Sequence, residues 1–380
     1  MDITLPTPLL GGLSPQVFMR RHWQKKPLLI RAAVSGEAPI VSRNQLFELA
    51  AQDDVESRLV LRQMVRQDVR WSMRQGPFKR ASMPPLKQAG WTLLVQGLDL
   101  HLPAAHDLLS RFRFVPDARL DDVMVSYASD AGGVGPHVDS YDVFLLQVQG
   151  RRRWRIGPVQ DSTLVPDVPL KILANFKPQE EWLLEAGDML YLPPGWAHDG
   201  IAEGECLTAS IGFRAPGREE LSRDVLQSAL DAVDPDERGP LYRDPKQLAT
   251  AEPGRIPLAL QEFSAAAVAR IMADPKALAC ALGEVLSEPK PGVWFDGSSP
   301  HPAGGGLRLD RRTRMLYDDW FVFINGESYR AAGRDAKLMR KLADRHCLTT
   351  REVQSLSVDA RGLIEQWSDA GWLIADAARD

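Results

Sequence analysis

Two short stretches decide the fold: Gly132-Gly-Val-Gly-Pro-His-Val-Asp139 and Tyr191-Leu-Pro-Pro-Gly-Trp-Ala-His198. The first places a histidine and an aspartate two residues apart, just after a glycine-rich turn. Residues i and i+2 of a β-strand face the same way, so both side chains can reach one ion. The second stretch adds a histidine beyond a tight turn. Two imidazoles and a carboxylate on one face form a triad typical of non-haem iron(II) sites. We therefore predict that His137, Asp139 and His198 bind iron(II).

The surroundings of these two stretches strengthen the prediction. Alone, a His-x-Asp triplet is weak evidence, and a single histidine near a turn is more often a surface or core residue. Here β-type segments with glycine and proline turns between them surround both stretches, at Asp122–Ser129, Asp142–Gln149, Arg152–Ile156, Glu181–Leu184, Met189–Leu192 and Leu207–Phe213. This spacing predicts a small β-barrel or sandwich.

A basic run, Gly150-Arg-Arg-Arg-Trp-Arg-Ile156, is expected to begin a new strand fifteen residues after His137, beyond one strand and a turn. Strand alternation places Arg152 and Trp154 on one face and the odd-numbered arginines on the other, solvated face. An arginine inside an apolar barrel needs an anionic partner, because it stays protonated. The distal carboxylate of 2-oxoglutarate is such a partner, and a guanidinium can bind it through two hydrogen bonds.

Two other chemistries are excluded by the motifs. The glycine-rich stretch at 132–135 is no P-loop, because no Gly-Lys-Ser/Thr follows and a strand comes next. A Ser-His-Asp hydrolase is disfavoured because the chain has no Gly-x-Ser-x-Gly turn.

Four motifs together resemble the jumonji-type ribosomal oxygenases of bacteria: Arg21-His-Trp-Gln-Lys-Lys-Pro-Leu28, Gly135-Pro-His-Val-Asp-Ser-Tyr-Asp-Val-Phe144, Gly150-Arg-Arg-Arg-Trp154 and Leu192-Pro-Pro-Gly-Trp-Ala-His198. The resemblance implies an iron(II)- and 2-oxoglutarate-dependent oxygenase that hydroxylates the β-carbon of an arginine in a ribosomal protein. Large-subunit protein L-sixteen is the expected substrate. His137, Asp139 and His198 match the iron ligands of the family, and Arg152 matches its 2-oxoglutarate anchor.

The same resemblance implies that Asp122, Tyr141 and Ser210 bind the substrate arginine. Asp122 and Ser126 share one face of a strand, so Asp122 can pair with a guanidinium while Tyr141 stacks on its plane. Ser126 is a candidate second contact for 2-oxoglutarate. From the residues alone, Asp122 can also be a solvated carboxylate at a strand edge, and Asp121 can take either part. Tyr141 can equally be a rim or core aromatic.

The expected fold class is α+β with three parts. The resemblance implies a double-stranded β-helix (cupin/jumonji) catalytic domain at 1–216, a helical dimerisation region at 217–295 and a C-terminal winged-helix domain at 296–380. Apolar residues do recur at helical spacing between Leu221 and Leu286, and this stripe is too long for a small domain to bury, which favours a homodimer.

The residues also predict individual elements around these boundaries. Pro302–Gly306 is expected to belong to a linker. Helices are expected at Pro15–Trp23, Arg43–Gln52, Ala336–Asp344 and Val358–Trp372, with strands at Met315–Tyr317 and Phe321–Ile324 and a helix cap at Thr349 or Thr350.

Composition limits the partners and the compartment. A net charge of −4 and a pI near 6.0 argue against a general nucleic-acid binder. The C-terminal region mixes basic and acidic residues, which favours a structural or protein-binding role over direct nucleic-acid binding. The chain has no apolar segment of about 20 residues that would span a membrane. Its widely spaced cysteines are expected in a reducing cytoplasm: Cys206, Cys280 and Cys347.

Two alternatives from other classes remain open. One is a ligand-sensing cupin coupled to a winged-helix DNA-binding regulator, and the other is a zinc cupin isomerase. The triad together with Arg152 discriminates between these and an oxygenase, because a pure sensor needs neither. The zinc cupin would also need one metal ligand more than the motif supplies.

Overall fold

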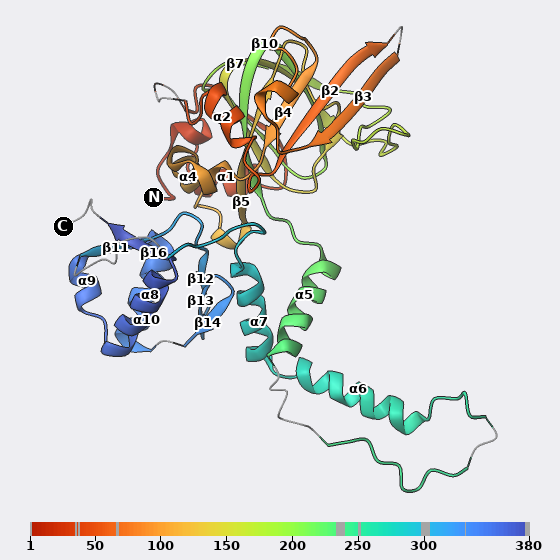
Figure 1. Cartoon of the computed structure of the whole chain (residues 1–380), viewed down its shortest axis with the longest axis vertical. Coiled ribbons are helices and arrows are strands. Elements are labelled where there is room, and N and C mark those ends of the chain that lie inside the picture. Colours follow the sequence, from red (N-terminus) through yellow and green to blue (C-terminus); the bar gives the residue numbers. More distant parts are fainter. Residues whose placement is uncertain are drawn as a thin grey trace. The chain divides into compact units, whose positions relative to one another are not determined.

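The computed structural model describes residues 2–34, 36, 39–65, 68–232, 240–249, 252–297, 305–330 and 332–376. The chain divides into two compact units, Met1–Ala215 and Pro216–Asp380 (Figure 1). The division into three domains at 1–216, 217–295 and 296–380 stays a prediction.

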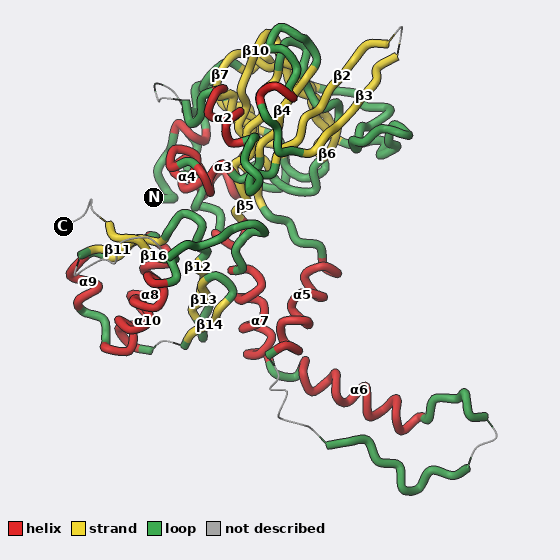
Figure 2. Tube along the Cα trace, in the orientation of Figure 1, coloured by secondary structure: helices red, strands yellow, loops and turns green. Residues whose placement is uncertain are grey.

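The first unit is built on one antiparallel sheet in the order β1-β9-β7-β10-β5-β4-β2-β3, with β6 beside β10 and β8 beside β7. Figure 2 draws its strands in yellow. Its strands are β1 Leu28–Ile30, β2 Ser57–Val65, β3 Asp68–Gln75, β4 Trp91–Val95, β5 Leu120–Ala128, β6 His137–Val138, β7 Val143–Pro158, β8 Glu180–Leu184, β9 Met189–Leu192 and β10 Trp196–Phe213. The long strands β7 and β10 pair with each other over most of their length. Each also pairs along its other edge with two further strands.

The two separate strands predicted at Asp142–Gln149 and Arg152–Ile156 are wrong, because β7 is continuous through both. Gly150 lies between them with a φ of 68°, a conformation that bends the strand without ending it. A Cβ atom at Gly150 would lie 2.2 Å from the carbonyl oxygen of Glu205 on β10. The glycine therefore permits the close approach of the paired strand. Likewise, the predicted strand Leu207–Phe213 is only the second half of β10.

Short helices cover one end of the sheet. They are α1 Pro15–Arg21, α2 Arg43–Leu49, α3 Leu98–His101 and α4 Pro103–Ser110, with 3₁₀ turns at Pro8–Leu10, Arg80–Ser82 and Asp117–Arg119. Helix α1 begins where Ser14 caps it by accepting a hydrogen bond from the amide of Val17, and Pro15 supplies the first helical residue. In α2, Ser42 and Gln45 form a reciprocal capping box. Both helices end two or three residues before the predicted ends.

An aromatic core lies between α1 and the sheet. Phe18 contacts Phe144 and Tyr191, with ring centroids 5.4 and 4.9 Å apart. The hydroxyl of Tyr191 donates a 2.6 Å hydrogen bond to the fully buried Asp142. This bond satisfies one carboxylate oxygen, and the side-chain amide of Gln24 donates to the other. Asp142 thus fixes the start of β7, one residue after the expected substrate contact Tyr141.

In the described residues of the second unit, a small α+β fold follows helices α5 Arg218–Asp231, α6 Leu258–Met272 and α7 Pro275–Ser287. The helices of this fold are α8 Gly333–Arg345, α9 Thr350–Gln354 and α10 Val358–Asp369. Its strands form two three-stranded sheets: β11 Gly306–Leu309 between β15 Cys347–Leu348 and β16 Leu373–Asp376, and β13 Val322–Ile324 between β12 Met315–Tyr317 and β14 Glu327–Tyr329.

The sequence predicted the main elements of this unit. The strand at Met315–Tyr317 is confirmed, and Thr349 caps α9 through a capping box with Glu352. The predicted third helix, Val358–Trp372, ends earlier because Gly371 has a φ of 78° and ends the helical path. Within the predicted linker, residues 302–304 lie outside the described part of the chain.

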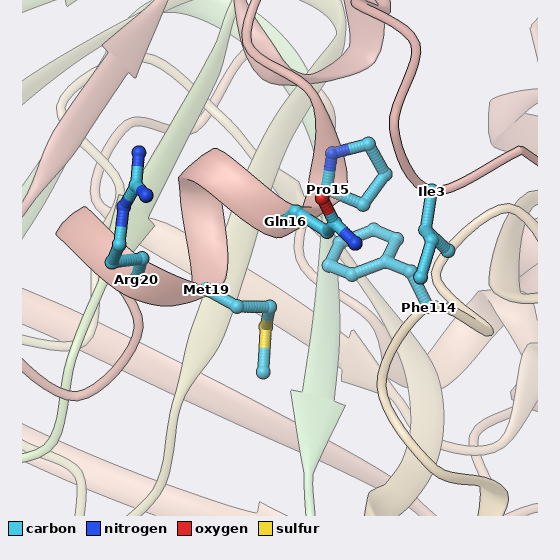
Figure 3. Close-up of a pocket in the computed structure, with 6 residues that line it drawn as sticks. All are labelled: Ile3, Pro15, Gln16, Met19, Arg20 and Phe114. Carbon is cyan, nitrogen blue, oxygen red and sulfur yellow. The ribbon is translucent and has the colours of Figure 1, made fainter.

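None of the helices in the described ranges has both the length and the hydropathy needed to cross a bilayer. A pocket of about 410 Å³ lies beside α1 (Figure 3). Figure 3 places Phe114 next to Pro15 and Gln16, with Arg20 pointing away from them. The pocket contains none of the predicted site residues, since it is lined by Ile3, Pro15, Gln16, Met19, Arg20 and Phe114.

Candidate metal and co-substrate site

A cavity of about 600 Å³ opens within the first unit, and every predicted site residue lines it. It contains side chains from strands far apart in sequence, because β5, β7 and β10 are neighbours in the sheet. The predicted residues on its wall are Asp122, Ser126, His137, Asp139, Tyr141, Arg152, His198 and Ser210.

His137, Asp139 and His198 offer three ligand atoms that all lie within 4.8 Å of one another. Nε2 of His198 is 3.6 Å from Oδ2 of Asp139, and Nε2 of His137 is 3.9 Å from Oδ1. The two imidazole centroids are 4.2 Å apart. The backbone explains this proximity, because His137 on β6 pairs directly with His198 on β10. Two imidazole nitrogens and a carboxylate at this separation can share one divalent ion.

Backbone carbonyls orient both imidazoles. Nδ1 of His137 lies 2.9 Å from the carbonyl oxygen of Gly135, and Nδ1 of His198 lies 3.2 Å from that of Trp196. A carbonyl oxygen only accepts, so Nδ1 carries the proton in each ring and Nε2 presents its lone pair. Such an outer hydrogen bond fixes the tautomer that a metal requires.

The electrostatics of the triad favour a bound cation. Burial lowers the pKa of His198 well below its usual range, and the nearby His137 lowers it further. His198 is therefore neutral and can act as a ligand. Burial raises the pKa of the Asp139 carboxyl, although His137 opposes the shift. A divalent cation would relieve the cost of holding the Asp139 carboxylate ionised in this partly dry site.

Arg152 is the second notable feature of the cavity. It is only 5% exposed, and of its three guanidinium nitrogens only Nη1 has a hydrogen-bond partner, the hydroxyl of Ser126 at 3.2 Å. Nε and Nη2 are buried and have no hydrogen-bond partner among the described residues. A permanently charged group left in this way is costly unless an anion binds it. The arrangement fits a carboxylate that accepts two hydrogen bonds.

The predicted alternation along β7 is observed. Arg152 and Trp154 line the cavity. On the other face, Arg153 forms ion pairs with Glu181 and Glu203, and Arg155 lies 2.5 Å from Asp199. Arg153 and Arg155 thus have carboxylate partners of their own, while the inward Arg152 has none in the described structure.

The expected substrate contacts line the same cavity. The carboxylate of Asp122 accepts a 3.0 Å hydrogen bond from the amide of Gly97, which orients it. Tyr141 is 39% exposed. Burial raises the pKa of its phenol, and Asp139 and Asp122 raise it further, so the hydroxyl stays protonated and can donate. Ser210 pairs with Met124 on the neighbouring strand β5. An acidic group beside an aromatic face suits a planar cation.

Several cavity residues were not predicted from the sequence. Arg58, Val60 and Met73 come from the hairpin β2–β3, which the sequence analysis did not predict. The β-favouring apolar run Leu59-Val-Leu61 was an available signal for this strand. Gly200 was also missed, and it lies opposite Trp154 in the ladder between β7 and β10. Its role depends on a cross-strand neighbour, which sequence spacing does not reveal.

Comparison with known families gives two matches. A JmjC domain matches residues 107–221, and a ROXA-like winged helix matches residues 270–374. The predicted α+β class, with a cupin-like JmjC domain and a C-terminal winged helix, is confirmed.

Among proteins with similar sequences, the ribosomal protein uL16 3-hydroxylase of Escherichia coli is 39% identical over 245 residues, which cover 63% of this chain and 62% of that protein. A probable ribosomal oxygenase of Haemophilus influenzae is 35% identical over 239 residues, covering 62% of this chain and 57% of that protein. The matched stretch thus spans about three fifths of each relative.

The solved structures extend the likeness over nearly the whole chain. A crystal structure of Escherichia coli YcfD superposes with a TM-score of 0.80 and 28% identity, covering 94% of this chain and 97% of that one. YcfD in complex with cobalt and 2-oxoglutarate superposes with a TM-score of 0.76, also at 28% identity, covering 95% and 98%. The predicted family resemblance is confirmed by these matches.

Proposed function

We propose that this chain, which belongs to the JmjC family of oxygenases, uses iron(II) and 2-oxoglutarate to hydroxylate an arginine of a ribosomal protein. One observation carries the proposal. The buried guanidinium of Arg152, with two nitrogens that lack a partner in the described structure, lines the same cavity as the cluster His137, Asp139 and His198. A metal triad and an anion anchor in one cavity suit a co-substrate that carries a carboxylate at its far end.

Each residue has a distinct role in this proposal. His137, Asp139 and His198 hold iron(II), while Arg152 and Ser126 bind the distal carboxylate of 2-oxoglutarate. When bound, iron and 2-oxoglutarate supply the chemistry that inserts one oxygen atom of O2 into a C–H bond and yields succinate and carbon dioxide. The protein holds the target carbon close to the metal and limits the access of water.

The substrate is proposed from the cavity and from the relatives together. Asp122 and Tyr141 suit the planar guanidinium of arginine better than the ammonium of lysine. The N–H groups of a guanidinium can donate to the Asp122 carboxylate while its plane lies on the Tyr141 ring. The Escherichia coli relative is named for uL16, which is protein L-sixteen of the large subunit. We therefore expect the β-carbon of an arginine in that protein to be the target.

Substitution of Asp122 tests the substrate assignment. Asp122→Asn can still accept the amide of Gly97 but loses the charge that pairs with a guanidinium. A hydrogen bond to a charged group contributes about 1.5–3 kcal/mol, so we expect kcat/KM for the arginine peptide to fall by about 10- to 150-fold. Peptide hydroxylation is measured by mass spectrometry, and binding of 2-oxoglutarate by calorimetry.

Binding of 2-oxoglutarate serves as the internal control for this variant, because Asp122 contacts only the peptide in the proposed complex. Asp161→Asn is the matched control, since Asp161 is exposed and outside the cavity. Normal hydroxylation by Asp122→Asn, or equal turnover of arginine and lysine peptides by the unmodified protein, would contradict the assignment.

A homodimer is proposed from helix α6, which has no buried residue in the single chain. Its apolar side chains include Val268 and Met272, each 53% exposed. A second copy would bury them. We expect light scattering at micromolar concentration to give a molar mass twice that of one chain. Val268→Glu should lower the molar mass to that of a single chain. Ala266→Glu adds the same charge on a different face of the helix and should leave the dimer intact. A monomeric unmodified protein would refute the homodimer.

The winged-helix unit is proposed to bind protein or to serve a structural role. Three of its basic side chains have partners within the unit: Arg312 pairs with Asp310 at 2.7 Å, Lys341 pairs with Glu352, and Arg340 donates to the backbone carbonyl of Asp318. Such a surface suits phosphate binding poorly, so the alternative of a DNA-binding regulator is not favoured. A cytoplasmic location remains our proposal.

A further inference from the structure

In the β-ladder between β7 and β10, a single cross-strand pair on the cavity face, Gly200 and Trp154, lies between the metal cluster and the acid anchor. In the pairing of β7 with β10, His198 lies opposite Ile156, Gly200 opposite Trp154, and Ala202 opposite Arg152. Cross-strand partners face the same side of a sheet. The side chain of Trp154 therefore lies between the two groups that would hold the opposite ends of 2-oxoglutarate. His198 and Ala202 are four residues apart on one strand, a backbone separation of about 13 Å.

Trp154 is tightly held in this position. Its ring centroid is 5.8 Å from that of His198, and the guanidinium carbon of Arg152 lies 5.7 Å from the ring centroid. The residue is only 5% exposed. Its indole N–H is buried and has no hydrogen-bond partner in the described part of the chain. The indole thus contacts both ends of the proposed co-substrate site and retains an unused donor.

Gly200 makes room for the indole. A Cβ atom at this position would lie 2.6 to 2.9 Å from three atoms of the Trp154 ring. The φ of Gly200 is not positive, so a turn does not explain the glycine at this position. The missing side chain allows the indole to lie against β10. With any other residue at 200, the ring would have to move from its place between His198 and Arg152.

We propose that Trp154 and Gly200 form the floor of the co-substrate site and select the length of the 2-oxo acid. This inference rests on the proposed function and assigns it two positioning residues. The indole lines the space between the metal cluster and Arg152, and a five-carbon 2-oxo dicarboxylic acid lying on it reaches both ends. A six-carbon acid has no room for its extra methylene, and a four-carbon acid is too short to reach the guanidinium.

The test compares the binding of three acids to the manganese(II)-loaded full-length protein by calorimetry: oxaloacetate with four carbons, 2-oxoglutarate with five and 2-oxoadipate with six. One methylene in a fitted pocket changes affinity by about 10-fold or more. We expect the unmodified protein to prefer 2-oxoglutarate over 2-oxoadipate by at least that factor. Trp154→Ala should reduce this preference by about 10-fold, while its affinity for manganese(II) stays unchanged.

Gly200→Ala provides the second variant and acts in the opposite direction. The alanine side chain should displace the indole into the cavity. The affinity for 2-oxoglutarate should then fall by about 10-fold, and the affinity for oxaloacetate by less. Trp182→Ala is the matched control, because Trp182 pairs with Trp154 from the neighbouring strand β8 but does not line the cavity. If Trp154 had only a structural role, Trp154→Ala would lower the affinity for all three acids by the same factor.

The outcomes separate the two claims. If the unmodified protein binds 2-oxoglutarate and both variants keep its ratio of affinities for the three acids, the length selection is wrong and the proposed function stands. If the unmodified protein binds none of the acids in the presence of manganese(II), the proposed function fails and the inference fails with it.

Discussion

Replacement of Asp139 by alanine is expected to abolish both metal binding and turnover of 2-oxoglutarate while the fold survives. Asp139 supplies the anionic ligand of the cluster, and its oxygens lie 3.6 and 3.9 Å from Nε2 of His198 and of His137. Loss of a group that only orients a metal ligand already lowers metal affinity or activity by about 10- to 100-fold. Loss of a ligand itself should lower them further. His137→Ala should behave in the same way.

Metal binding is measured directly by equilibrium dialysis with iron(II) under anaerobic conditions. Thermal unfolding gives an independent signal, because a bound ion stabilises only a protein that can hold it. Iron(II) should raise the Tm of the unmodified protein and of the control Asp161→Ala but not that of Asp139→Ala. Full turnover in Asp139→Ala or His137→Ala would show that the cluster is not the metal site.

Replacement of Arg152 by methionine should raise the concentration of 2-oxoglutarate that the enzyme requires by about 10- to 150-fold. This range follows from the 1.5–3 kcal/mol that a charged hydrogen bond contributes. Methionine retains much of the volume of the side chain but carries no charge. Since two buried guanidinium nitrogens have no partner in the described structure, the ligand-free variant should unfold at the same temperature as the unmodified protein or at a higher one.

The comparison with Arg153→Met distinguishes the anchor from a general loss of charge. Arg153 is adjacent in sequence but lies on the other face of β7, where Glu181 and Glu203 bind it. This control should require no more 2-oxoglutarate than the unmodified protein. An unchanged requirement in Arg152→Met would mean that another residue anchors the acid.

The candidate site was predictable because its spacing follows strand geometry. His137 and Asp139 are two residues apart, and a two-residue period places both on one face of an extended chain. The same period separates Arg152 from Arg151 and Arg153 along β7. His198 is distant in sequence, and only the Pro-Pro-Gly turn before it indicated a common site. Its pairing with His137 across β6 and β10 is a tertiary feature.

The rest of the sheet depends on pairing between strands that are distant in sequence, which a local sequence pattern does not indicate. Gly150 resembles a turn residue in sequence, yet β7 continues through it because β10 pairs on both sides of the bend. Strands β2, β3 and β4 form one edge of the sheet, and none was predicted. In β2 the apolar run Leu59-Val-Leu61 is short and does not alternate with polar residues, so it is a weak strand signal. The cavity wall that these strands contribute therefore was not predicted.

The helices were easier to predict from the sequence than the partners that cover their apolar faces. Helix caps are local, so Thr349 marked the start of α9 correctly. Helix α6 has the apolar residues expected for a buried helix, yet Val268 and Met272 are exposed in the single chain. Sequence alone does not distinguish an apolar face buried within one chain from one that a second copy covers.

The central claim is that the cavity couples oxidation of 2-oxoglutarate to hydroxylation of a ribosomal protein. The most direct measurement incubates the full-length protein with iron(II), 2-oxoglutarate, O2 and protein L-sixteen, and counts the carbon dioxide released for each oxygen atom gained by the substrate. We expect one molecule of carbon dioxide for each oxygen atom gained, with the oxygen on an arginine and no gain when 2-oxoglutarate is omitted. A gain of oxygen without 2-oxoglutarate, or release of carbon dioxide with no gain on L-sixteen, would contradict it.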